Sequence, residues 1–225
     1  AVSEPTAGHV ISAYALGVVV GAPLIFRDGA HAFAATPAGE ALLAAAPVSL
    51  LIFFAELGVR PDVMTAMHNP FFDLKFAVTL ALAASAIAVS LHLSRPEASL
   101  RSFGWWLLIP AGILVAAISG EMMMPQRTPM MTRLIGKNSM ACMTAIPAMS
   151  LPLLIGALYG LRQGAPARPA VAGAVAGLLS AGLAATVYAS HCTDDSPLFV
   201  ATWYTLATAI VASVGALMGK RALRY

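Results

Sequence analysis

Chemically active side chains are concentrated in the stretch His191-Cys192-Thr193-Asp194-Asp195, which holds an imidazole, a thiol and two carboxylates within five positions. A deprotonated thiol is both a nucleophile and a metal ligand. Thiolate and imidazole together suit soft or borderline metal ions such as Zn²⁺ or Cu⁺. A tight polar turn around a structural cysteine explains the same residues equally well, so both readings stay open at this stage.

The thiol of Cys192 has one potential partner, because Cys142 is the second of the two cysteines in the chain. Two cysteines can form one disulfide or contribute to one metal site. The sequence therefore predicts an optional ion, Zn²⁺, Cd²⁺ or a copper ion, with no cofactor required. The predicted ligand set is Cys142, Cys192, His191 and Asp194. A protonated His191 would favour the Cys192 thiolate, whereas Asp194 and Asp195 would oppose it by like charge.

The composition places these residues in a membrane protein. Hydrophobic residues make up 59% of the 225 residues and charged residues only 10%, against about 25% charged residues in soluble domains. Crossing a bilayer takes about 20 apolar residues in a helix. Seven segments approach or meet that length: Gly8 to Phe26, Ala41 to Val59, Phe76 to Ser94, Gly104 to Ser119, Ser139 to Gly160, Ala170 to Ser190 and Leu198 to Gly219.

The predicted fold is an all-α polytopic transmembrane bundle, because lipid forces each segment to satisfy its own backbone hydrogen bonds. Gly173, Gly177 and Ala181 follow a small-xxx-small pattern that predicts close helix packing. No span carries the central array of charges typical of ion-coupled transporters. No phosphate-binding loop, catalytic triad or HExxH motif is present. We therefore expect no enzymatic activity, and the scattered cations of the +3 chain do not indicate nucleic-acid binding.

The basic residues of the short connections set the predicted orientation. Arg162, Arg168 and the tail residues Lys220 and Arg221 are placed in the cytoplasm, with the C-terminus. Alternating spans then bring Cys142, Cys192 and His68 to the outer face. There the segment 120–143 holds seven of the eleven methionines, for which filling of interfacial gaps is favoured over copper binding.

Three further expectations concern polar and aromatic residues near the span ends. Glu56 and Arg60 are four residues apart and are expected to form a helix ion pair. Asp73 and Lys75 are expected in a short amphipathic surface loop. Trp203 and Tyr204 are expected at the membrane interface, where aromatic residues gather.

The segment from Ser139 through Tyr225 resembles the NrsF-like family of membrane anti-sigma factors, the negative regulators of an extracytoplasmic-function sigma factor. The most specific matching string is Tyr188-Ala-Ser-His-Cys-Thr-Asp-Asp-Ser-Pro-Leu-Phe199, supported by Ser150-Leu-Pro152 and Trp203-Tyr204. Similarity is looser from Leu50 to Asn138. The resemblance implies six spans, cytoplasmic termini and a response of Cys142 and Cys192 to metal or oxidative stress.

The first forty residues depart from that family pattern. Residues 8–23 look instead like a span of a major-facilitator transporter. We therefore divide the chain into an atypical N-terminal segment, 1–40, with one extra apolar span, and a six-span NrsF-like domain, 41–225. Only Arg27 to Glu40 occupies the position where such proteins hold the sigma factor.

The resulting functional prediction is a bacterial inner-membrane anti-sigma factor that senses stress at outer-face cysteines and sequesters a cytoplasmic sigma factor. The expected partners are that sigma factor and the lipid bilayer. Two alternatives remain: an accessory structural subunit of a membrane complex, and a quinone-linked thiol oxidoreductase, which the lack of a CxxC motif disfavours.

Overall fold

The structure is a computed structural model that describes residues 28–93, 104–125, 128–164 and 166–223. The extra apolar span predicted at Gly8 to Phe26, with its likeness to a transporter helix, lies outside the described residues. The first described residues, 28–34, are helical and bury Phe33 in the main core. The division at residue 40 therefore stays a prediction.

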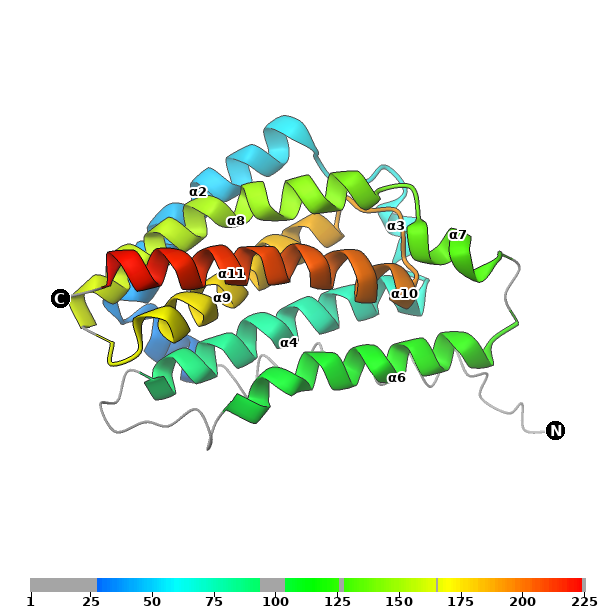
Figure 1. The fold of residues 1–225 in the computed structure, drawn as a ribbon. Coiled ribbons are helices and arrows are strands. Elements are labelled where there is room, and N and C mark those ends of the chain that lie inside the picture. The colour runs from blue at the N-terminus through cyan, green and yellow to red at the C-terminus, as the bar shows by residue number, and fades with distance from the viewer. Residues whose placement is uncertain (1–27, 94–103, 126–127, 165, 224–225) are drawn as a thin grey trace.

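Within the described residues, six helical stretches are long and apolar enough to cross a membrane, and they run side by side in Figure 1. Each corresponds to one of the predicted spans, so the all-α bundle is confirmed. The spans are built from α2 (Pro37–Glu56), α4 (Pro70–Leu93), η1 with α6 (Gly104–Leu108, Ile109–Met123), α8 (Ser139–Leu161), α9 (Pro169–Ala189), and α10, η3 and α11 (Pro197–Phe199, Val200–Tyr204, Thr205–Ala222).

Two short helices lie in the connections at one end of the bundle, on the right of Figure 1. They are α3 (Val63–Ala66), between α2 and α4, and α7 (Met130–Ile135), between α6 and α8. The connection from α9 to α10, residues 190–196, reaches the same end, because Arg60 N–H donates to the Ser190 carbonyl at 3.1 Å. The predicted common face of these three connections is therefore confirmed.

The centre of the bundle is a seam between α9 and α11 that contains almost no side-chain volume. A Cβ atom at Gly173 would collide with the Gly215 carbonyl oxygen, and one at Gly177 would lie 2.7 Å from the Val211 carbonyl oxygen. Only glycine permits such backbone contact. The small-residue pattern predicted from the sequence is therefore the packing face of α9.

Helix α6 is the least buried of the six spans. Only Pro110, Ala117 and Glu121 of its residues are buried, and its main neighbour is α4. Figure 1 shows it at the edge of the bundle. One side of α6 therefore faces the surroundings along most of its length.

Two local expectations were wrong. Lys75 lies inside α4 and is buried, so it is not part of a surface loop. Tyr204 is buried at the end of a turn of π-helix, where it packs in a core cluster rather than lying at an interface. Trp203, in contrast, is partly exposed, and its Nε1 donates to the Leu134 carbonyl at 2.9 Å.

Candidate functional site: a buried pair of thiols beneath an ion-pair cluster

The connections at the α3 and α7 end are tied together by a buried ion-pair cluster of Arg60, Lys75 and Asp195. Arg60 Nη1 lies 3.0 Å from Asp195 Oδ1, and Lys75 Nζ lies 2.6 Å from the same oxygen. Lys75 is only 1% exposed. Asp195 thus pairs with two cations that come from two other parts of the chain, and Asp62 supplies the second negative charge to Arg60. Buried charges are ordinarily paired in this way.

The same two cations hold the backbone that follows Cys192. Lys75 Nζ donates to the Cys192 carbonyl at 2.9 Å, and Arg60 Nη1 donates to that carbonyl at 3.2 Å. Both cations also lie over the ring of Phe72, at 5.3 and 5.5 Å from its centroid. These charge-assisted contacts fix the position of the connection against α4.

Arg60 also forms a two-pronged pair with Asp62, with N–O distances of 2.8 Å for both prongs. This pairing and the neighbouring Asp195 raise the pKa of Arg60 above its usual value. The predicted ion pair between Glu56 and Arg60 is therefore wrong. The physical reason is that α2 ends at Glu56, so Arg60 is not on the same helix.

Asp194 connects this end of α9 to the start of α8. Its Oδ2 accepts from the backbone N–H groups of Lys137 and Asn138 at 2.9 and 2.8 Å, and from the Asn138 side chain at 2.9 Å. A carboxylate at a helix N-terminus satisfies donors that the helix leaves unpaired. Gly136 makes this approach possible, because its φ is +61° and a Cβ there would collide with the Phe199 ring.

A second ion pair holds the end of α6. Arg133 Nη1 lies 2.9 Å from Glu121 Oε1, and Ser196 Oγ donates to the same oxygen at 2.7 Å. Glu121 is buried although it lies near a helix end. This contact links α6, α7 and the connection that carries Cys192.

Cys142 and Cys192 lie beneath these polar contacts in one buried cluster with Tyr188, Tyr204 and Phe199, which we call the thiol cluster. Both cysteines are free thiols and neither has exposed surface. The Tyr188 and Tyr204 rings are 5.8 Å apart. The structure thus brings the two predicted cysteines into one packed group, from the start of α8 and the end of α9.

Burial raises the pKa of the Cys192 thiol, with the charge of Lys75 acting in the opposite direction. Burial has this effect because an apolar environment disfavours the charged thiolate. A buried neutral thiol is a poor nucleophile. In this arrangement Cys192 is therefore a protected thiol, and its reactivity depends on opening of the cluster.

His191 and Asp194 do not join the two thiols as a ligand set. His191 Nδ1 lies 2.9 Å from the Gly58 carbonyl, which can only accept, so that nitrogen carries the proton. The Asp194 carboxylate is engaged by Lys137 and Asn138 as described. No group of three or more His, Cys, Asp or Glu side chains is placed to hold a metal within the described parts of the chain. The four-residue metal site stays a prediction. The contact of His191 Nδ1 with Gly58 is compatible with it, because Nε2 is the ring nitrogen that would bind the metal.

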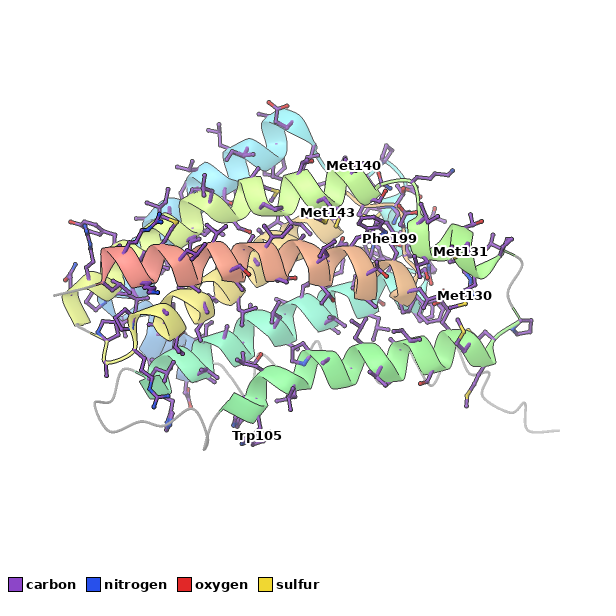
Figure 2. All side chains as sticks on the ribbon, viewed as in Figure 1. Trp105, Met130, Met131, Met140, Met143 and Phe199 are labelled. Atoms are coloured by element: carbon purple, nitrogen blue, oxygen red, sulfur yellow. The ribbon has the colours of Figure 1, made fainter. Side chains whose placement is uncertain are left out.

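Methionines gather at the same end of the bundle. Figure 2 shows Met130, Met131, Met140 and Met143 near Phe199, with Trp105 at the opposite end. Met64 and Met67, near α3, are also exposed. Their thioethers do not form part of the thiol cluster, except that Met143 packs against its edge.

Sequence reasoning missed Lys75, Arg60, Glu121 and Arg133 as members of the site. One signal was available, because Lys75 and Glu121 stand next to long apolar runs. Lysine and glutamate are almost never fully buried unless they are paired, so both residues could have been expected to have a partner of opposite charge. The ion pairs of Arg60 and Lys75 with Asp195 join positions 135 and 120 residues apart, so they leave no local signal.

Comparison with known proteins identifies the group to which this architecture belongs. A family described as "Negative regulator of sigma F" matches residues 27–225. The "Anti-sigma-F factor NrsF" of Caulobacter vibrioides is 32% identical over 179 residues, which cover 79% of this chain and 83% of that protein. The "Probable anti-sigma-F factor NrsF" of Azospira oryzae is 32% identical over 175 residues, 78% of this chain and 82% of that protein.

No solved structure matches the chain. The family match covers all six described spans and the connection with His191, Cys192, Asp194 and Asp195. Such a family is regulatory rather than catalytic, in line with the predicted lack of enzymatic motifs. The chain therefore belongs to the NrsF family, the negative regulators of sigma F.

Proposed function

We propose that this protein is an inner-membrane negative regulator that binds a sigma factor of the extracytoplasmic-function class at its cytoplasmic face. Chemical modification of Cys142 and Cys192 at the outer face releases that sigma factor. The observation that carries the proposal is the joint burial of the two thiols, in a family of sigma regulators, at the end where three connections interlock.

The position of the thiols explains how a local reaction can act at a distance. Cys142 lies in the first turn of α8 and Cys192 follows the end of α9. Both helices run from the thiol cluster to the other end of the bundle (Figure 1). A bond between the two sulfurs would draw the two helix ends together. A reagent can shift the packing of the bundle only to the extent that it favours one arrangement over the other.

Oxidation is the reaction that this geometry supports most directly. Disulfide formation breaks two S–H bonds, forms one S–S bond, releases two protons and transfers two electrons to a two-electron oxidant of the outer compartment. That compartment is oxidising in bacteria, so the product would persist. A thiophilic metal ion bound by the two sulfurs is the second trigger we propose.

The orientation follows from charge. Arg162, Lys220 and Arg221 lie at the end of the bundle opposite the thiol cluster, and Arg162 Nε donates to the Ala222 carbonyl at 2.9 Å. Basic residues in short connections favour the cytoplasmic side. We therefore propose that the C-terminus and the sigma-binding surface are cytoplasmic.

Two measurements test the regulator role. The full chain, purified in detergent from its own host, should retain a sigma factor that mass spectrometry identifies. Overexpression of the wild-type chain should repress a promoter dependent on that sigma factor. Recovery of the intact protein without any sigma factor, and no repression, would exclude the regulator role.

The thiol role is tested in the same reporter strain with Cys142→Ser and Cys192→Ser. Both variants should repress the promoter but fail to release it when cells are treated with diamide or Cd²⁺. The matched control is Ser190→Ala, next to the same connection. If both serine variants respond as the wild type does, the thiols are structural residues.

A further inference from the structure

A lateral cavity lies between α4, α6, α9 and α11, in the half of the bundle nearer the thiol cluster. Its volume is about 420 Å³, within the range of about 300–1,000 Å³ typical of small-molecule sites. Its lining is almost entirely apolar. Two of its hydroxyl groups are engaged within their own helices, since Thr79 donates to the Lys75 carbonyl and Thr208 to the Tyr204 carbonyl.

The cavity exists because α6 stands away from α11. Helix α6 packs mainly on α4, and Val115, which lines the cavity, is mostly exposed. Leu206 and Ile210 of α11 are exposed as well. In six spans that cross a membrane, these surfaces face hydrocarbon, so the cavity opens onto the lipid rather than onto water. An apolar space of this size gains dispersion contacts only from an apolar occupant.

The cavity and the thiol cluster share a wall. Val78, Ala185, Val200 and Tyr204 line the cavity and belong to the same buried cluster as Cys142 and Cys192. Val200 and Tyr204 are the first and last residues of the π-helical turn. Such turns are uncommon and frequently occur at functional sites. A side-chain movement in this turn would join the cavity to the thiols.

Buried ion pairs cover the thiol cluster on its aqueous side. Lys75 and Arg60 hold the Cys192 carbonyl and Asp195, and the side chains of both cations are almost fully buried. A charged reagent from the outer solution would have to separate these ion pairs, which removes buried charges from their partners. An uncharged reagent in the bilayer meets a mostly apolar lining that contains no charged side chain.

We propose that the lateral cavity is a binding site for an uncharged, apolar, thiol-reactive molecule dissolved in the bilayer, which reaches Cys142 and Cys192 from the lipid side. This proposal rests on the proposed thiol-sensing function and names the class of its signal. With an unsaturated carbonyl compound, the S–H bond breaks, a C–S bond forms at the β-carbon, and the proton ends on the α-carbon. No oxidant is then needed.

The test uses the full chain in phosphatidylcholine vesicles and two maleimides, N-phenylmaleimide and a sulfonated, membrane-impermeant one. Alkylation of each cysteine is followed by mass spectrometry, and each rate is divided by that of a cysteine peptide with the same reagent. The normalised rate should be at least about tenfold higher for N-phenylmaleimide, because it needs no opening of the ion-pair cluster. Equal normalised rates would overturn the proposal.

Filling the cavity gives the second arm. Ala201→Phe and Ala209→Phe place a ring among the lining residues and should slow N-phenylmaleimide about fivefold or more, since the reagent competes with the ring for space. Ala116→Phe, on an exposed position of α6 outside the lining, should not. Unchanged rates in both cavity variants, in protein that elutes as a single species, would contradict the lipid-side route.

The third arm of the test weakens the ion-pair cluster on the aqueous side of the thiols. It does not require the cavity variants to fold. Lys75→Met removes one bond to the Cys192 carbonyl and one ion pair, whereas Lys75→Arg retains a cation. Lys75→Met should accelerate the sulfonated maleimide and leave N-phenylmaleimide unchanged, and Lys75→Arg should restore the slow sulfonated reaction. Equal acceleration of both reagents would show one shared aqueous route and overturn the proposal.

The outcomes separate this inference from the regulator role. Alkylation is measured without a sigma factor, whereas the role as a regulator is decided by the promoter assay with Cys142→Ser and Cys192→Ser. A protein alkylated only from water can still be a thiol-dependent regulator. A lipid acyl chain that occupies the cavity and leaves alkylation rates unaffected by the cavity variants would also count against the proposal.

Discussion

The seam between α9 and α11 and the flank formed by α6 show two opposite ways of holding a membrane helix. In the apolar stretch of α9, 61% of the residues are buried, whereas in that of η1 and α6 only 17% are buried. At the seam, glycine backbones of α9 and α11 touch directly. At the flank, α6 keeps an open cavity and is fastened near its end by the contacts of Glu121 with Arg133 and Ser196.

This difference indicates which parts of the bundle can move. Backbone-to-backbone contact has few alternative arrangements, because any shift creates either a collision or a void. A helix held by the contacts of one carboxylate and by a few apolar side chains can tilt or separate at lower cost. The thiol cluster lies between the α9–α11 seam and the α6 flank, since Cys192 follows α9 and Tyr204 stands just before α11. Under the proposed lipid-side route, the rigid frame would carry the response and the loosely held flank would give access to the thiols.

The largest expected effect comes from disrupting the seam. Gly173→Leu should destabilise the protein by more than about 3 kcal/mol, because the new side chain collides with the Gly215 backbone, which cannot withdraw. Unfolding by dodecyl sulfate, followed by circular dichroism, measures the change. Gly112→Leu on α6, where a Cβ meets nothing within 4 Å, is the control and should unfold like the wild type. Similar losses in both variants would remove the contrast between the two regions.

A smaller effect is expected from releasing the end of α6. Glu121→Gln keeps an acceptor for Ser196 but removes the charge that faces Arg133. The loss should be about 2 kcal/mol, because a hydrogen bond to a charged group contributes about 1.5–3 kcal/mol. Hydrogen exchange should rise in α6 and not in α9. The contrast would fail if exchange in α9 increased as much as in α6.

The turn before α8 tests how closely the connections pack on the thiol cluster. Gly136→Ala combines a φ of +61° with a collision against Phe199, whereas Gly58→Ala has a φ of +71° and no neighbour within 4 Å. A positive φ costs alanine about 1–2 kcal/mol. Gly136→Ala should lose more than Gly58→Ala, because the ψ of −168° at Gly136 adds backbone strain and the new Cβ meets the Phe199 ring. Equal midpoints in dodecyl sulfate unfolding would mean that Phe199 yields freely.

The smallest effect concerns the exposed arm of the ion-pair cluster. The hydrogen bonds from Arg60 lower the pKa of Asp62 to about 2, from an ordinary value of 3.8. A carboxyl whose folded pKa is lowered stabilises the fold above its unfolded pKa, and that stability is lost as the pH falls through the folded value. The loss should therefore occur between about pH 4 and pH 2.

Thermal unfolding of wild type and Asp62→Asn at pH 5, 4, 3 and 2 measures this contribution. The difference between the two should be slight, because Asp62 is 55% exposed, and should vanish toward pH 2. A difference that grew as the pH fell would contradict the assigned pairing of Asp62 with Arg60.

The all-α fold class and the six described membrane spans could be predicted from composition and hydropathy alone. Each span satisfies its backbone hydrogen bonds internally, so its existence depends only on local length and hydropathy. The common face of Cys142 and Cys192 followed from counting alternating spans, and the α9 packing face followed from the spacing of Gly173 and Gly177. These inferences needed no knowledge of which helices are neighbours.

Which side chains meet depends on the packing of the helices and could not be predicted from local patterns. Arg60 is 135 positions and Lys75 is 120 positions from Asp195 in the chain. They pair with it because the α2–α4 connection and the start of α4 pack against the connection that follows α9. The Asp194 carboxylate, a predicted metal ligand, accepts hydrogen bonds at the start of α8. The burial of Tyr204 and the cavity beside α6 likewise depend on how the helices pack. Interactions between distant segments leave no periodic signal in a sequence, and this is the physical reason that they were not foreseen.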